Sequence, residues 1–258
     1  MSVMCAVNSV RPNYYYNYYG YPPQQPENRT QNASKAVVTG GLLYLLTLGL
    51  NKGSKFFADK LMRGKEFTED KQVVHDIAQN MVDKNGLKVK LGYINEQNKH
   101  LFGSGPNIDA VAKGQNAFYD DIAKMAVAPK ERPSLMLHEL GHAINAKKGG
   151  ILKLLQKSRK YAPYAPMALL MLNGAFGKKD NKKGFFEKYA LPLGFAAFLP
   201  TVIEEGIASI RGINAAKVFK NLDLRPLKRN YRLAWLTYLI SGIGLGIAAK
   251  QASVQQRL

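Results

Sequence analysis

The chain has 258 residues, 46% of them apolar, so it can bury a sizeable core and is not predominantly disordered. Its 37 Lys and Arg outnumber its 18 Asp and Glu, giving a formal net charge of +19. Such an excess indicates an anionic partner, either nucleic acid or anionic lipid. The basic residues are spread along the chain without a dense basic arm or a nucleic-acid motif, so anionic lipid is the favoured partner.

The N-terminal segment, residues 1–35, is predicted to be a disordered tail rich in Tyr, Pro and Gln. Its composition cannot bury a core. The first residues lack the basic start and apolar core of a secretory signal. Cys5 is the single cysteine, which excludes an intrachain disulfide framework and fits a reducing compartment.

Four apolar stretches are the membrane-span candidates, at 36–50, 161–176, 189–203 and 233–249. As helices they measure roughly 22 to 26 Å, slightly less than a ~30 Å hydrocarbon core. The first and last are the better spans, and the last carries Gly242 and Gly246 as a small-residue packing face. The middle pair fits either a membrane hairpin or two buried or interfacial helices, because the lysine-rich loop between them conflicts with the positive-inside rule.

A soluble-looking region at 51–160 lies between these stretches. Apolar residues at helical spacing predict a helix over 68–83, with Thr68 as its N-cap. Alternation in "LKVKLGYI" then predicts a half-buried strand, and further short strands are expected around Phe118 and over 122–128. We therefore expect an α+β fold that is mainly helical, with a small β-sheet.

The sharpest motif is "LMLHELGHAINAKKGG" at 135–150. On a helix, His138 and His142 lie one turn apart on the same face, where two imidazoles can hold one Zn²⁺. Glu139 points slightly aside, within reach of a metal-bound water that it can deprotonate. The pattern predicts a catalytic zinc site with one ion per chain.

A tetrahedral catalytic zinc needs a third protein ligand, and "EEGIAS" offers two adjacent carboxylates. Glu205 is followed on its face by small residues, Ala208, Ser209 and Gly212, on which another helix can approach closely. Glu204 shares its side with Arg211 instead. We therefore predict Glu205 as the ligand, with Glu204 as an alternative ligand, a supporting residue or an ion-pair partner of Arg211.

Taken in order, these motifs resemble the membrane zinc peptidases of the HtpX and CAAX prenyl protease type, which are gluzincins. The resemblance covers roughly 68–216 and the membrane segments. It includes "QNAFYDD" at 115–121, which looks like the family's Asn-Ala-Phe element, and "EEGIAS", which looks like its Glu-x-x-Ala-Asp motif. Ser209 departs from the family, because Asp usually stands there to orient a ligand histidine.

The resemblance implies a zincin-like metallopeptidase domain among two to four transmembrane helices, hydrolysing peptide bonds of a peptide or membrane-protein substrate. The substrate would lie along an edge strand at 122–128, near Asn116, Ala117 and Phe118. Arg211 and Tyr231 are the candidates for stabilising the oxyanion. The implied location is a bacterial-type inner or cytoplasmic membrane, with the active site facing the cytoplasm and possible work in membrane-protein quality control.

The sequence leaves a second class of function open. Ser209 also fits a catalytically weak or inactive membrane adaptor or scaffold that keeps a zincin fold. A nucleic-acid role rests on the charge alone. The predicted segments are a tail at 1–35, a transmembrane helix at 36–50, the catalytic region at 51–160, an apolar helical pair at 161–203, the helix with the third ligand at 204–230 and a transmembrane helix at 231–250.

Overall fold

The computed structural model describes residues 52–53, 56–57, 60–61, 63–176 and 184–255. The predicted tail at 1–35 and the apolar stretch at 36–50 lie outside the described residues. In chain order the elements are α2 (Lys71–Lys84), β1 (Lys90–Ile94), the 3-10 helix η1 (Lys99–Phe102), α3 (Pro106–Ala112), β2 (Phe118–Asp120), β3 (Met125–Pro129), α4 (Leu135–Lys148), α5 (Gly150–Ser158), the 3-10 helix η2 (Ala162–Tyr164), α6 (Ala165–Phe176), α7 (Phe185–Ala216) and α8 (Arg225–Gln255).

The sheet has three strands in the order β1-β3-β2. β3 pairs with β1 in parallel and with β2 antiparallel. Side chains alternate along β3, as strand geometry requires. Ala126 and Ala128 face the larger core, whereas Val127 faces the smaller one.

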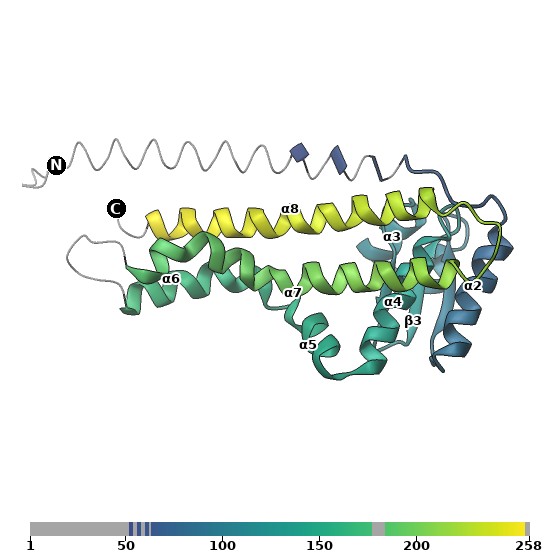
Figure 1. Cartoon of the computed structure of the whole chain (residues 1–258), viewed down its shortest axis with the longest axis horizontal. Helices are drawn as coiled ribbons and strands as arrows, with labels where there is room; N and C mark the ends of the chain where they lie inside the picture. Colours follow the sequence, from purple (N-terminus) through teal and green to yellow (C-terminus); the bar gives the residue numbers. More distant parts are fainter. Residues whose placement is uncertain (1–51, 54–55, 58–59, 62, 177–183, 256–258) are drawn as a thin grey trace, which may run out of the picture.

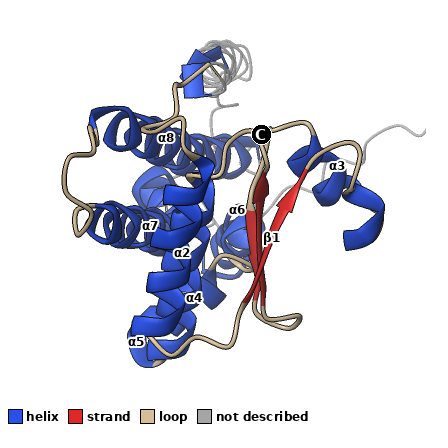
Figure 2. Ribbon diagram, turned by 90° about the vertical axis from the view of Figure 1, so that its right-hand side faces the viewer, coloured by secondary structure: helices blue, strands red, loops and turns tan. Residues whose placement is uncertain are grey.

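The larger core lies between one face of the sheet and the helices α2, α4, α7 and α8, as Figure 2 shows. Ile77 of α2, Leu137 and Leu140 of α4 and Leu227 of α8 are fully buried there. The opposite face of the sheet is covered by α3, through Ile108 and Val111. The predicted mainly helical α+β class with a small sheet is therefore confirmed.

The helices α7 and α8 pack side by side and extend beyond the sheet, with α6 against their far ends (Figure 1). Their contact depends on glycines. A Cβ on Gly246 would lie 2.6 Å from the carbonyl oxygen of Leu191, and one on Gly194 would lie 2.9 Å from the Cα of Gly246. The predicted packing face at Gly242 and Gly246 is thus directed at α7.

Both long helices meet the length and hydropathy expected of a membrane span, over 185–216 and 225–253. The helix α6 begins at Ala165 and ends at Phe176, which is too short for a span by itself. Among the described residues, α7 and α8 are therefore the candidate membrane-spanning helices.

Several predicted boundaries were wrong. The N-cap of α2 is Asp70, whose side chain accepts from the backbone N–H of Gln72, whereas Thr68 accepts from the N–H of Asp70. The segment 122–124 is a turn and not part of a strand. The strand that follows it, β3, is central in the sheet, so it is not the predicted edge strand.

The boundary predicted at residue 203 does not exist either. The apolar stretch 189–203 and the segment carrying Glu204 and Glu205 form one continuous helix, α7, with Pro192 and Pro200 inside it. This helix ends at Ala216, and a loop precedes α8, so 204–230 is not a single helix. The last predicted transmembrane helix, at 231–250, lies within α8 but is shorter than it.

The glycine contacts predict opposite effects for two alanine substitutions on α8. Gly246→Ala should lower the unfolding free energy by about 1–3 kcal/mol, because its methyl group would press on the α7 backbone. Gly244→Ala is the matched control: its Cβ meets nothing within 4 Å, and alanine improves helix propensity. Thermal unfolding midpoints under one solution condition measure both. Equal midpoints for the two variants would contradict the packing.

Candidate functional site

The helix α4 is held in the centre of the molecule. It begins after Ser134, whose backbone carbonyl accepts a hydrogen bond of 2.6 Å from the Tyr231 hydroxyl of α8. It packs against α7 so closely that a Cβ on Gly141 would lie 2.5 Å from the carbonyl oxygen of Ala208. The predicted small-residue face of α7 thus meets α4, and it brings the carboxylates of α7 opposite the histidines.

Three side-chain atoms converge between the two helices. The Nε2 atoms of His138 and His142 lie 3.1 Å apart. Oε2 of Glu205 lies 3.1 Å from the first nitrogen and 3.7 Å from the second. All three residues are buried, with exposed fractions of 8%, 4% and 1%.

This triangle has the size of a metal site. Ligands at 2.0–2.1 Å from a tetrahedral zinc are separated from one another by about 3.3–3.4 Å. The three observed separations bracket that value. Two ring nitrogens facing each other can share one proton at most, whereas both can coordinate one cation. The cluster can therefore hold a metal ion.

The opposite sides of both rings have their own partners. Nδ1 of His142 lies 2.8 Å from Oε1 of Glu204, and Nδ1 of His138 lies 3.2 Å from the hydroxyl of Ser209. Asn145 also donates to Oε1 of Glu204, at 3.0 Å. Hydrogen bonds at Nδ1 leave Nε2 of each ring available to a metal and fix the ring orientation. Glu204 thus lies behind His142, and Glu205 lies beside both Nε2 atoms.

Glu139 is buried next to this triangle. Its carboxylate belongs to a group with both histidines in which the ligand atoms lie within 4.8 Å of one another. Burial raises the pKa of Glu139, although the nearby His142 and His138 partly offset the increase. A carboxyl group with a raised pKa is suited to accept and return a proton near neutral pH.

His142 is surrounded by negative charge. Burial lowers the pKa of this ring, but the hydrogen bond that Nδ1 of His142 donates to Glu204 and the charges of Glu205 and Glu139 outweigh burial and raise the pKa to about 9. The same charges would attract a divalent cation, which would take the place of the proton.

Arg159, which follows α5 directly, is a site residue that the sequence did not predict. Its guanidinium forms an ion pair with Oε1 of Glu205 and donates to the Tyr238 hydroxyl at 3.3 Å. It also lies over the Tyr238 ring, 5.6 Å from the centroid. Nothing in the local sequence distinguishes Arg159 from its basic neighbours, because the contact depends on how α5 packs against α7.

The two residues predicted to stabilise an oxyanion have other partners. The Tyr231 hydroxyl donates to Ser134, and its ring packs on His138. Nε of Arg211 donates to Oδ1 of Asn145 at 2.7 Å, so Arg211 is linked to Glu204 through Asn145 and does not pair with it directly. These contacts do not support an oxyanion role for either residue.

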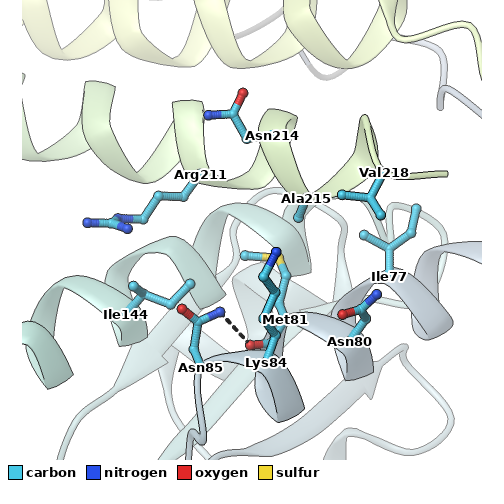
Figure 3. Close-up of a pocket in the computed structure, with 10 residues that line it drawn as sticks. All are labelled: Ile77, Asn80, Met81, Lys84, Asn85, Ile144, Arg211, Asn214, Ala215 and Val218. Carbon is cyan, nitrogen blue, oxygen red and sulfur yellow. Dashed lines mark hydrogen bonds between the residues drawn. The ribbon is translucent and has the colours of Figure 1, made fainter.

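Arg211 also borders a hollow between α2, α4 and α7, shown in Figure 3. The hollow is lined by Ile77, Asn80, Met81, Lys84, Asn85, Ile144, Arg211, Asn214, Ala215 and Val218. None of these side chains belongs to the His and Glu cluster. The hollow is therefore separate from the candidate metal site.

The predicted substrate segment lies at the edge of the sheet. Asn116 and Ala117 immediately precede β2, and Phe118 begins it. β2 is an outer strand, and it also packs against α4. β2 is therefore the outer strand that contacts the histidine-bearing helix, in place of the predicted segment 122–128.

The chain was compared with family models, curated proteins and solved structures, and none of them matches it. Function is therefore inferred from the geometry of the site.

The geometry predicts that Glu→Gln substitution weakens zinc binding to different extents at the two adjacent glutamates. Glu205→Gln should weaken zinc binding by more than about 100-fold, because it removes a converging ligand. Glu204→Gln should weaken it by only about 10–100-fold, the range for residues that orient a ligand. Competition with a chromophoric chelator measures both affinities. A larger loss at Glu204 than at Glu205 would contradict the assignment.

The contact of Ser209 with His138 predicts a graded change in zinc affinity among substitutions at Ser209. Ser209→Ala removes the partner of Nδ1 of His138 and should weaken zinc binding about tenfold or more. Ser209→Asp should bind zinc at least as tightly as the parent, because a charged acceptor makes a stronger hydrogen bond. Ser241→Ala is the control, since that hydroxyl only bonds the carbonyl oxygen of Thr237 in its own helix. Tighter binding by the alanine variant than by the aspartate variant would overturn this role.

Proposed function

We propose that the protein is a membrane-anchored zinc-dependent endopeptidase. The observation that carries this proposal is the convergence of two histidine nitrogens and one carboxylate oxygen, with a second carboxylate beside them. His138, His142 and Glu205 would hold the ion, leaving its fourth position for water or substrate. A zinc ion there would supply a Lewis acid for the scissile carbonyl and lower the pKa of a bound water.

The chain's own residues supply the remaining chemistry. Glu139 takes the proton of the attacking water on its carboxylate and delivers it to the leaving amine, and its raised pKa suits both transfers. Glu204 and Ser209 hold the two imidazole rings in position. The outer edge of β2 offers backbone groups that can pair with an extended substrate peptide.

The membrane location is supported by the two long apolar helices. No charged residue occurs in 189–203 of α7 or in 233–249 of α8. The region 51–160 carries 20 basic and 12 acidic residues, which favours the cytoplasmic side of a bacterial-type inner membrane. The substrate class that fits this location is a membrane protein or a membrane-associated peptide, as in quality control.

Glu139→Gln tests the proposed base. The variant should retain one zinc per chain, because Glu139 is not among the three converging ligands, but should cleave about 10²–10⁴-fold more slowly. The readouts are zinc content and the rate of new N-termini formed by mass spectrometry, with denatured casein as the probe and self-cleavage followed in parallel. Glu131→Gln is the control, since Glu131 is exposed and pairs only with Lys71. Cleavage by Glu139→Gln at the parental rate would show that Glu139 is not the base.

A second candidate function is a scaffold that retains the zincin-like site with little activity. Ser209 favours it, because a neutral hydroxyl orients His138 less strongly than a carboxylate would. The two candidates differ in a complementation assay with His138→Ala. Loss of cellular function supports the peptidase, and full function supports the scaffold.

A further inference from the structure

The helix α5 exposes apolar and basic side chains together. Ile151 and Leu154 are 72% and 64% exposed, although both are large aliphatic residues. Six Lys and Arg lie within 147–160, and no acidic residue occurs between Glu139 and Asp180. Among the described residues, no carboxylate forms an ion pair with Lys153, Lys157 or Lys160. Such a surface is not covered by the rest of the described chain.

The side chains of α5 divide into three sectors around its axis, at about 100° per residue. The half-buried Leu152 and Leu155 face the protein, where α5 contacts α7. Ile151 and Leu154 occupy the adjoining exposed sector. Lys153 and Lys157 occupy the third sector, on the side of Ile151 and Leu154 that is away from the protein. A helix with one face on protein, one apolar face outward and one basic face lies naturally in a membrane interface.

The position of α5 along the long helices agrees with this arrangement. The stretch 185–203 of α7, in which Glu187 and Lys188 near its start are the charged residues, is about 28 Å long as a helix, close to the ~30 Å of a hydrocarbon core. The end of that stretch lies next to Glu204 and Glu205, and Glu205 is the ion-pair partner of Arg159 at the end of α5. A bilayer around 185–203 would therefore have its surface at the level of α5.

Aromatic and apolar side chains continue the exposed surface past α5. Tyr161 and Tyr164 are 72% and 63% exposed, as is usual for tyrosines at headgroup level. Beyond them, Met167 and Met171 of α6 are also exposed. These exposed side chains therefore change from basic, through aromatic, to apolar from α5 to α6, which lies away from the sheet (Figure 1).

From these observations we propose that α5 is an interfacial helix that binds the headgroups of an anionic bilayer through Lys153, Lys157 and Lys160 and inserts Ile151 and Leu154 at the acyl boundary. This rests on the membrane location in the proposed function but not on catalysis. It places the His and Glu cluster at the membrane surface. The substrate would then be a chain segment presented at headgroup level.

The test measures the depth of α5 in a bilayer. Nitroxide labels are attached to single cysteines at Leu154, Ile243 and Leu101 in a Cys5→Ser background, and the full chain is reconstituted in vesicles. Accessibility to oxygen and to a soluble nickel complex is measured in phosphatidylcholine with and without one third phosphatidylglycerol. Ile243 of α8 reports the proposed span, and Leu101 is 72% exposed on η1, which packs against α3 and β1.

In anionic vesicles the oxygen-to-nickel ratio at Leu154 should be several-fold higher than at Leu101 and lower than at Ile243. Replacing Lys153, Lys157 and Lys160 by Glu should reduce it to the Leu101 value. The same change of net charge at three other exposed lysines, Lys113, Lys130 and Lys220, should leave it unchanged.

The results distinguish a failure of the interfacial helix from a failure of the membrane location on which it rests. A water-exposed label at Ile243 would overturn the membrane location itself. A deep Ile243 with Leu154 at the Leu101 value would overturn the interfacial helix alone and leave α5 free for another partner, such as an acidic protein. Equal ratios at Leu154 in neutral and anionic vesicles would overturn recognition of anionic headgroups.

Discussion

The close contact between α4 and α7 is the constraint on which the site depends. Gly141 lets the backbones approach until a single methyl group would collide with Ala208. At that separation His138 and His142 of one helix meet two consecutive glutamates of the other. Because consecutive residues on a helix point about 100° apart, Glu205 reaches the Nε2 atoms while Glu204 reaches the far side of His142. The two adjacent carboxylates thereby have different partners.

The buried carboxylates of the cluster depend on positive charge close to them. Glu139, Glu204 and Glu205 are all buried. Arg159 forms an ion pair with Glu205, and His142, whose pKa is raised to about 9, lies 2.8 Å from Glu204. Burying several carboxylates is costly unless opposite charge compensates them. A divalent ion between the Nε2 atoms and Glu205 would provide that compensation in place of the proton on His142, and Glu139 would then lie next to a water on the metal. Electrostatics and ligand geometry thus favour the same occupant.

The sequence was sufficient for the parts of the site that depend on helix periodicity. The spacing of His138 and His142 placed both on one face of α4, and the small residues after Glu205 indicated the face that α4 approaches. Arg159 could not be predicted, because its contact with Glu205 depends on the packing of α5 on α7. The continuity of α7 was also missed, since Pro192 and Pro200 are usual helix breakers. The strand order was missed because local alternation contains no information on which strand is central.

The continuity of α7 links the candidate site to the proposed membrane. One helix carries the uncharged stretch 189–203 and, in the next turn, the carboxylates of the cluster. Helices are stiff on this scale, so the depth of the stretch in a bilayer would determine the height of Glu205 above the hydrocarbon. The ion pair of Arg159 with Glu205 connects α5 to the same point. If α5 lies on the headgroups, the side chain of Arg159 connects the lysines of α5 to Glu205, the proposed metal ligand. The membrane surface is then a structural boundary of the site.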